Sequence, residues 1–140
     1  GIDCNPGLSL GLTGVFMQKD AGLMSVMDEL RTLEPLIYAA NSGVPRSAFE
    51  NRLAHDFWEV GASGRVYTRD FVLSTLDERQ KNPREEVWSA YDFSVRKIED
   101  SHYLLTYALQ QPTRLSRRAT LWQMSIEGWK MLYHQGTPVI

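Results

Sequence analysis

The spacing of apolar residues changes near the middle of the chain, from the period of a helix to the period of a strand. In the first half, apolar residues recur at helical spacing and share one face: Leu23, Met27, Leu30, Leu33 and Ile37. Asp20 precedes this run and is predicted to cap the helix. Because Pro35 removes a backbone donor and disfavours helical geometry at Glu34, we expect a kink or a break there.

Shorter elements are predicted to follow. Pro45 suits the first turn of a second helix, which carries Phe49 and Leu53. Residues 57–60 are predicted as a short strand and residues 61–64 as a glycine-rich turn. A hydroxyl side chain, Thr68, then suits the N-cap of a third helix.

From Val87 onward the period becomes two. Four long segments rich in aromatic and β-branched residues follow one another: 87–98, 103–111, 115–126 and 128–135. Their short connections favour antiparallel neighbours, so the second half is predicted to be a four-stranded meander. Gly136-Thr137-Pro138 is predicted to end the last strand. Helices followed by strands indicate an α+β fold.

Neither face of the predicted sheet is cleanly polar. A sheet with one solvated face alternates more sharply between apolar and polar residues. We therefore expect the helices to cover one face and a second copy of the chain to cover part of the other. Since most homo-oligomers are two-fold dimers, this pattern predicts a homodimer formed through the sheet.

Length and charge narrow the class of protein. The 140 residues are predicted to hold one domain over residues 20–140, preceded by an N-terminal extension over residues 1–19. A formal charge of −2 predicts neither nucleic acid nor a membrane surface as a partner. A single cysteine, Cys4, excludes an internal disulfide framework and favours a cytoplasmic location. No stretch approaches the ~20 apolar residues that span a bilayer.

The candidate ligand-binding residues lie on the predicted strands. Arg118 and Trp122 share one face with Thr120 between them, a pattern suited to holding a planar anion by charge and stacking. Asp92 and Arg96 share a face of the first long strand and are candidates to join them. The alternative is a buried or interfacial Arg–Asp ion pair with the tryptophan in the core.

The last strand ends on His134 and Gln135, which both donate and accept hydrogen bonds. Adjacent strand residues face opposite ways, so we expect one to face a pocket and the other to face an edge or a partner chain. His134 is the preferred inward residue, as the candidate group for proton transfer. The three histidines show no metal-binding spacing, so no metal or cofactor is predicted.

Four segments together resemble a known superfamily: 56–69, 91–96, 116–122 and 128–138. In order and spacing they are similar to the nuclear transport factor 2-like superfamily, and most similar to its SnoaL-like branch, domain of unknown function 4440. The resemblance covers about residues 20–138 and implies a cystatin-like cone, in which a curved antiparallel sheet wraps around the N-terminal helices. It also implies a pocket at the open end of the cone and pairing of two copies through the sheet.

Three functional hypotheses follow, since this fold hosts many activities. The first is binding of a small organic molecule in an apolar pocket. The second is cofactor-free isomerisation, cyclisation or dehydration, with His134 or Asp92 as base and Arg118 or Tyr107 as electrophilic donor. The third is a non-catalytic dimerisation or interaction domain. The candidate lining of the pocket mixes both strand faces: Trp58, Tyr91, Arg96, Tyr107, Arg118, Trp122, His134 and Gln135.

Overall fold

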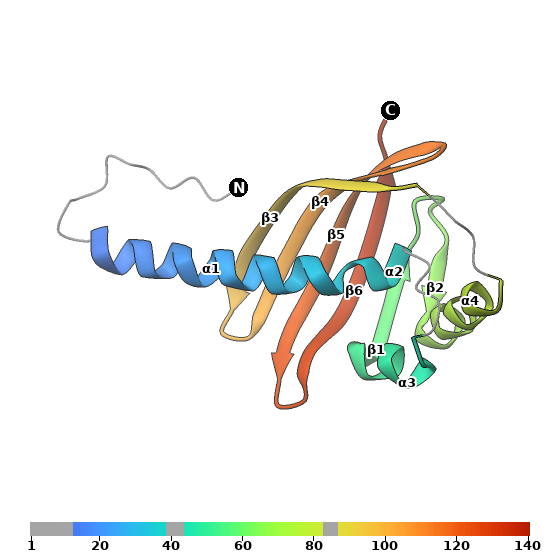
Figure 1. The fold of residues 1–140 in the computed structure, drawn as a ribbon, viewed down its shortest axis with the longest axis horizontal. Helices are drawn as coiled ribbons and strands as arrows, with labels where there is room; N and C mark the ends of the chain where they lie inside the picture. The colour runs from blue at the N-terminus through green and yellow to red at the C-terminus, as the bar shows by residue number, and fades with distance from the viewer. Residues whose placement is uncertain (1–12, 39–43, 83–86) are drawn as a thin grey trace.

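The computed structural model describes residues 13–38, 44–82 and 87–140, with side chains described from residue 22 onward. Its elements form one long helix, three shorter helices and a six-stranded sheet (Figure 1). Residues 1–12 of the predicted extension lie outside the described residues.

Helix α1 spans Thr13–Leu33 and begins earlier than the sequence predicted. The prediction of a cap at Asp20 is wrong, because residues 13–19 contain no proline and already belong to the helix. The predicted break is confirmed: α1 ends at Leu33, and the short helix α2 spans Pro35–Tyr38.

The middle of the chain holds two helices and two strands. Helix α3 spans Arg46–Arg52, strand β1 Leu53–Val60, strand β2 Val66–Thr68 and helix α4 Arg69–Lys81. Leu53, predicted on the helix, begins β1 instead, because this strand pairs with the last strand of the sheet. Strand β2 was not predicted, since three residues carry too short a pattern to read. The predicted cap is confirmed, as the Phe71 backbone N–H donates to the Thr68 hydroxyl at 3.2 Å.

The second half forms the predicted antiparallel meander. Strands β3, β4, β5 and β6 span Ser89–Glu99, His102–Gln111, Arg114–Ser125 and Gly128–Pro138. The order across the sheet is β2-β1-β6-β5-β4-β3, with β1 parallel to β6 and every other pair antiparallel. Strand β6 continues through Gly136 and ends at Pro138, the last residue of the segment predicted to end it. Its backbone remains paired with β5 out to Pro138, opposite Ser116.

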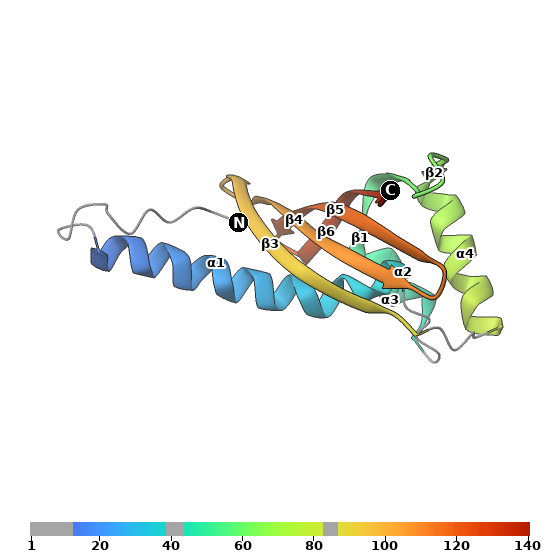
Figure 2. The same cartoon turned by 90° about the horizontal axis from the view of Figure 1, so that it is seen from above.

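One face of the sheet carries the core. Helix α1 crosses this inner face, and α4 stands at the end of the sheet beside β1 and β2 (Figures 1 and 2). The largest fully buried apolar side chains belong to this layer: Leu30, Leu53, Phe57, Leu73, Leu105, Leu109, Trp122 and Met131. No described helix covers the opposite, outer face (Figures 1 and 2), and most of its described side chains are half-buried or exposed. None of the described helices combines the length and the hydropathy that a membrane-spanning helix requires.

Candidate functional site

A buried carboxylate, Glu34, lies at the break between α1 and α2. Its backbone N–H donates to the Leu30 carbonyl at 2.9 Å, and its own carbonyl accepts from the Ile37 N–H at 3.2 Å. Pro35 forces the chain to turn at this residue, and the turn presents the side chain to the sheet. The Glu34 side chain is 0% exposed, so it depends entirely on protein donors.

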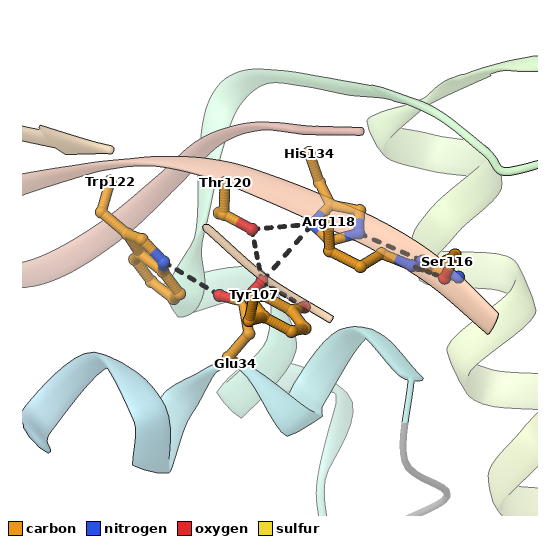
Figure 3. A network of polar contacts seen from close by, with 7 residues as sticks. All are labelled: Glu34, Tyr107, Ser116, Arg118, Thr120, Trp122 and His134. Atoms are coloured by element: carbon orange, nitrogen blue, oxygen red, sulfur yellow. Dashed lines mark hydrogen bonds and ion pairs between the residues drawn. The ribbon is translucent and has the colours of Figure 1, made fainter. Parts of the chain in front are cut away.

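Three donors from the inner face of the sheet satisfy this carboxylate (Figure 3). The Tyr107 hydroxyl donates to Oε1 at 2.8 Å, and the Trp122 indole N–H donates to Oε2 at 3.0 Å. The Thr120 hydroxyl also donates to Oε1. Strands β4 and β5 supply all three, because Thr120 and Trp122 share a face and Tyr107 lies on the neighbouring strand.

The network continues from Thr120 toward an arginine. The Nδ1 atom of His134 lies 2.7 Å from the Thr120 hydroxyl and 3.4 Å from Glu34 Oε1, and its Nε2 atom lies 3.2 Å from Arg118 Nη1. The guanidinium also donates through Nε to the Ser116 hydroxyl at 2.9 Å. A line of polar contacts therefore joins the core carboxylate to Arg118 (Figure 3).

Gly136 makes room for this arginine. It is the register partner of Arg118 on the neighbouring strand. A Cβ atom at residue 136 would lie 3.1 Å from both Cζ and Nε of Arg118, which is tighter than an ordinary contact. The guanidinium keeps its position because residue 136 has no side chain.

Arg118 borders a pocket of about 340 Å³ between α4, the β1–β2 turn and the start of β5. Apolar and aromatic side chains form part of the lining: Ile37, Tyr38, Tyr67, Phe71, Val72 and Leu76. Arg79, Arg114 and Arg118 also line it, against one acidic side chain, Glu59. With all four ionised, the described lining carries an excess of positive charge.

Burial shifts the pKa values of two of these groups. It raises the pKa of Glu59, and the positive charges of Arg118 and Arg79 act in the opposite direction. Burial also lowers the pKa of Arg118 from its usual value. Both shifts express the same physical condition, namely that charges at this pocket are poorly hydrated.

The structure divides the candidate residues into an inner and an outer group. Tyr107, Arg118, Trp122 and His134 come together on the inner face, where Tyr107, Trp122 and His134 are fully buried or nearly so. His134 is 0% exposed and does not line the pocket of about 340 Å³.

The remaining candidates lie elsewhere. Trp58, on the outer face, packs on Tyr133 with ring centroids 4.7 Å apart. Gln135 is exposed and accepts from the Tyr133 hydroxyl at 2.6 Å. Tyr91 and Arg96 are exposed on the edge strand β3.

Asp92 is also exposed, and its φ of 61° places it in the left-handed region at an irregularity of β3. A second hollow, of about 690 Å³, is bordered by Asp92 and Gln135 together with Tyr107 and Arg118. Arg118 thus borders both spaces. Arg96 borders neither space.

Sequence reasoning missed Glu34, Glu59, Arg79 and the steric role of Gly136. One of these had a readable signal. Glu34 is an acidic residue inside an apolar run and directly before a proline, in "TLEPLIY". The other three are brought to the site by pairing between strands and by the packing of α4, which no local pattern reveals.

Replacing Glu34 tests how much the buried network stabilises the fold. Glu34→Gln keeps the size and shape of the side chain, but it replaces one acceptor oxygen by an amide NH2 group among three existing donors. We expect the free energy of unfolding to fall by about 3 kcal/mol, measured by urea denaturation. Glu29→Gln, an exposed change on the same helix, serves as the control and should stay within about 0.5 kcal/mol of the parent. Equal effects of the two substitutions would contradict a stabilising role for the network.

The raised pKa of Glu59 predicts a direction for stability against pH. Because the folded state holds this proton more tightly than the unfolded chain, stability should fall as pH rises from the ordinary value of 4.5 through the raised pKa. Glu59→Gln removes this loss, so its melting temperature should exceed that of the parent at neutral pH. The difference should shrink at pH values below 4.5. A difference that is the same at both pH values would show that Glu59 does not titrate in this way.

Comparisons with known proteins bear on the fold. The sequence matches no protein-family model and has no significant match among curated proteins. Solved structures do match. An NTF2-like protein from Cytophaga hutchinsonii is 16% identical, with a TM-score of 0.60, over 82% of this chain and 96% of that chain.

Two other solved structures agree. An uncharacterised protein with a cystatin-like fold from Caulobacter vibrioides is 15% identical, with a TM-score of 0.63, over 86% of this chain and 89% of that chain. An NTF2-like protein of unknown function in nutrient uptake from Rhodospirillum rubrum is 16% identical, with a TM-score of 0.61, over 84% and 98%. Structural similarity at sequence identities this low establishes the fold and leaves the activity open. The helices packed on one face of a curved six-stranded sheet are therefore those of the NTF2-like, cystatin-like fold.

Proposed function

We propose that this protein binds a small organic anion with an apolar body in the pocket between α4 and the sheet. The observation that carries the proposal is the lining, which sets arginines beside apolar and aromatic side chains in one concave space. A volume of about 340 Å³ is within the range of small-ligand sites.

Arg118 is the anchor for the anion in this proposal. It is partly buried, and its Nε and Nη1 atoms are held by Ser116 and His134. Its Nη2 atom has a weaker partner, the Gln111 side-chain oxygen at 3.5 Å, which an incoming carboxylate can replace. An arginine whose side chain is already oriented loses less conformational entropy when it binds a ligand.

We also propose that the chain belongs to the SnoaL-like branch that it resembles in sequence. Segment 56–69 supplies most of β1, the β1–β2 turn and β2, which border the pocket, and segment 128–138 is β6, which supplies His134 to the polar network. We further propose a cytoplasmic location, which the single cysteine favours.

Neighbouring arginines on opposite faces of β5 provide the test. We expect benzoate, titrated into the protein and followed by calorimetry, to bind with a Kd of about 1 mM or lower. Arg118→Met should weaken this binding at least about tenfold, because it removes the anchoring charge. Arg117→Met makes the same change in net charge on the exposed face and should leave the Kd within about twofold.

Benzyl alcohol, the neutral analogue, should bind more weakly than benzoate. If benzoate, hexanoate and 4-hydroxybenzoate all fail to bind the parent protein, the proposal is wrong. An equal loss of binding in the two arginine variants would also contradict it, since it would place the anion elsewhere.

We also propose that a second copy of the chain covers the outer face of the sheet. An apolar row crosses four strands there: Trp58 on β1, Tyr133 on β6, Leu121 on β5 and Leu104 on β4 are successive register partners. Trp58 is 46% exposed, and the other three are partly exposed. A continuous apolar row of this kind is suited to a self-complementary two-fold contact.

Light scattering tests this dimer. The parent protein at micromolar concentration should show twice the mass of one chain. Leu121→Glu places a charge in the middle of the row and should yield the single-chain mass. Met124→Glu, an exposed position on the opposite face of the same strand, should leave the mass unchanged. A parent protein that is monomeric at this concentration would overturn the proposal.

A further inference from the structure

The contacts of Arg118 fix the hydrogen-bonding state of His134. A guanidinium has donors and no acceptor. Because Arg118 Nη1 lies 3.2 Å from His134 Nε2, this ring nitrogen has to be the acceptor and carries no proton. The proton of the neutral ring is then on Nδ1, which lies 2.7 Å from the Thr120 hydroxyl.

The other hydrogen bonds between His134 and Glu34 run in the same donor-to-acceptor direction. Thr120 accepts from the Nδ1–H of His134 and donates its own proton to Glu34 Oε1. Each member from Arg118 to His134 to Thr120 to Glu34 therefore donates to the next. Glu34 is an acceptor at the buried end, so it sets the direction of the whole chain.

Resting on the proposed function, we infer that His134 is a positioning residue for the anion site, not a base. In its Nδ1–H form, locked by Thr120 and Glu34, it accepts from one N–H of Nη1 and holds the guanidinium of Arg118 so that the Nη1–Nη2 edge is left for a planar carboxylate in the pocket. The ligand class this arrangement selects is a small carboxylic acid in its ionised form, because a fixed guanidinium edge matches two coplanar oxygens.

Steric contacts support the same placement. The guanidinium lies close to Gly136, in space that a Cβ atom at residue 136 would occupy, and the Ser116 hydroxyl accepts from Nε. His134 itself is 0% exposed, so a ligand in the pocket meets Arg118 before it can meet the imidazole. Glu59, the register partner of His134 on β1, is the acidic group that lines the pocket.

The first measurement is the ring of His134 by nitrogen NMR on the parent protein near neutral pH. The expected spectrum shows a protonated Nδ1 and a bare Nε2, and it should persist when benzoate is added to saturation. A ring protonated on Nε2, in the free or the benzoate-bound protein, would overturn the inference. This measurement needs no substitution, so it stands even if a variant fails to fold.

The second measurement compares two residues of similar size at position 134. His134→Gln can place its side-chain oxygen near the position of Nε2 and accept from Arg118, whereas His134→Leu cannot. We expect the Kd for benzoate to rise about tenfold in His134→Leu and to stay within about threefold of the parent in His134→Gln.

Tyr107→Phe is the matched structural control. It removes a hydroxyl bonded to the same Glu34 oxygen, but Tyr107 is not a link between Glu34 and Arg118. Its melting temperature should fall while the ring of His134 keeps its form. If His134→Leu and His134→Gln raise the Kd for benzoate equally, His134 does not position Arg118, and the proposal that the pocket binds an anion is unaffected. Failure of the parent protein to bind any carboxylate would instead overturn the proposed function.

Discussion

A carboxylate removed from water has to be given donors by the protein, and this requirement organises the centre of the molecule. Glu34 is fully buried, and its oxygens receive a hydroxyl from β4, a hydroxyl from β5 and an indole N–H from β5. Burial without these bonds would cost several kcal/mol. The carboxylate consequently ties the break between α1 and α2 to the middle of the sheet, and the geometry of each depends on the other.

The same carboxylate is connected to the pocket. Thr120 and His134 carry its influence along the inner face to Arg118, which lies where the core ends and the pocket begins. Gly136 completes the arrangement by leaving space for the guanidinium. Core and pocket are thus parts of one hydrogen-bonded structure, in which the buried end supplies rigidity and the outer end supplies an oriented charge.

Several features could be predicted from local sequence because their causes are local. Pro35 acts on the residue before it, so the break at Glu34 was readable. The hydroxyl of Thr68 acts on the backbone three residues later, so the start of α4 was readable. The alternation after Val87 predicted the meander, and strand parity predicted that Thr120 lies with Arg118 and Trp122 and that His134 and Gln135 face opposite ways. The beginning of α1 was placed too late in the chain, because an acidic cap residue also fits inside a helix.

Local sequence is sufficient for the α+β order of elements, the break in the long helix, the antiparallel meander and the two faces of each strand. These depend on backbone geometry and on the period of apolar residues over a few positions. The tertiary structure alone decided that β1 lies parallel to β6, that Glu34 faces Tyr107 and Trp122, and that Arg79 and Glu59 line one pocket with Arg118. Those contacts join residues tens of positions apart. They follow from the packing of whole elements, which no short stretch of sequence encodes.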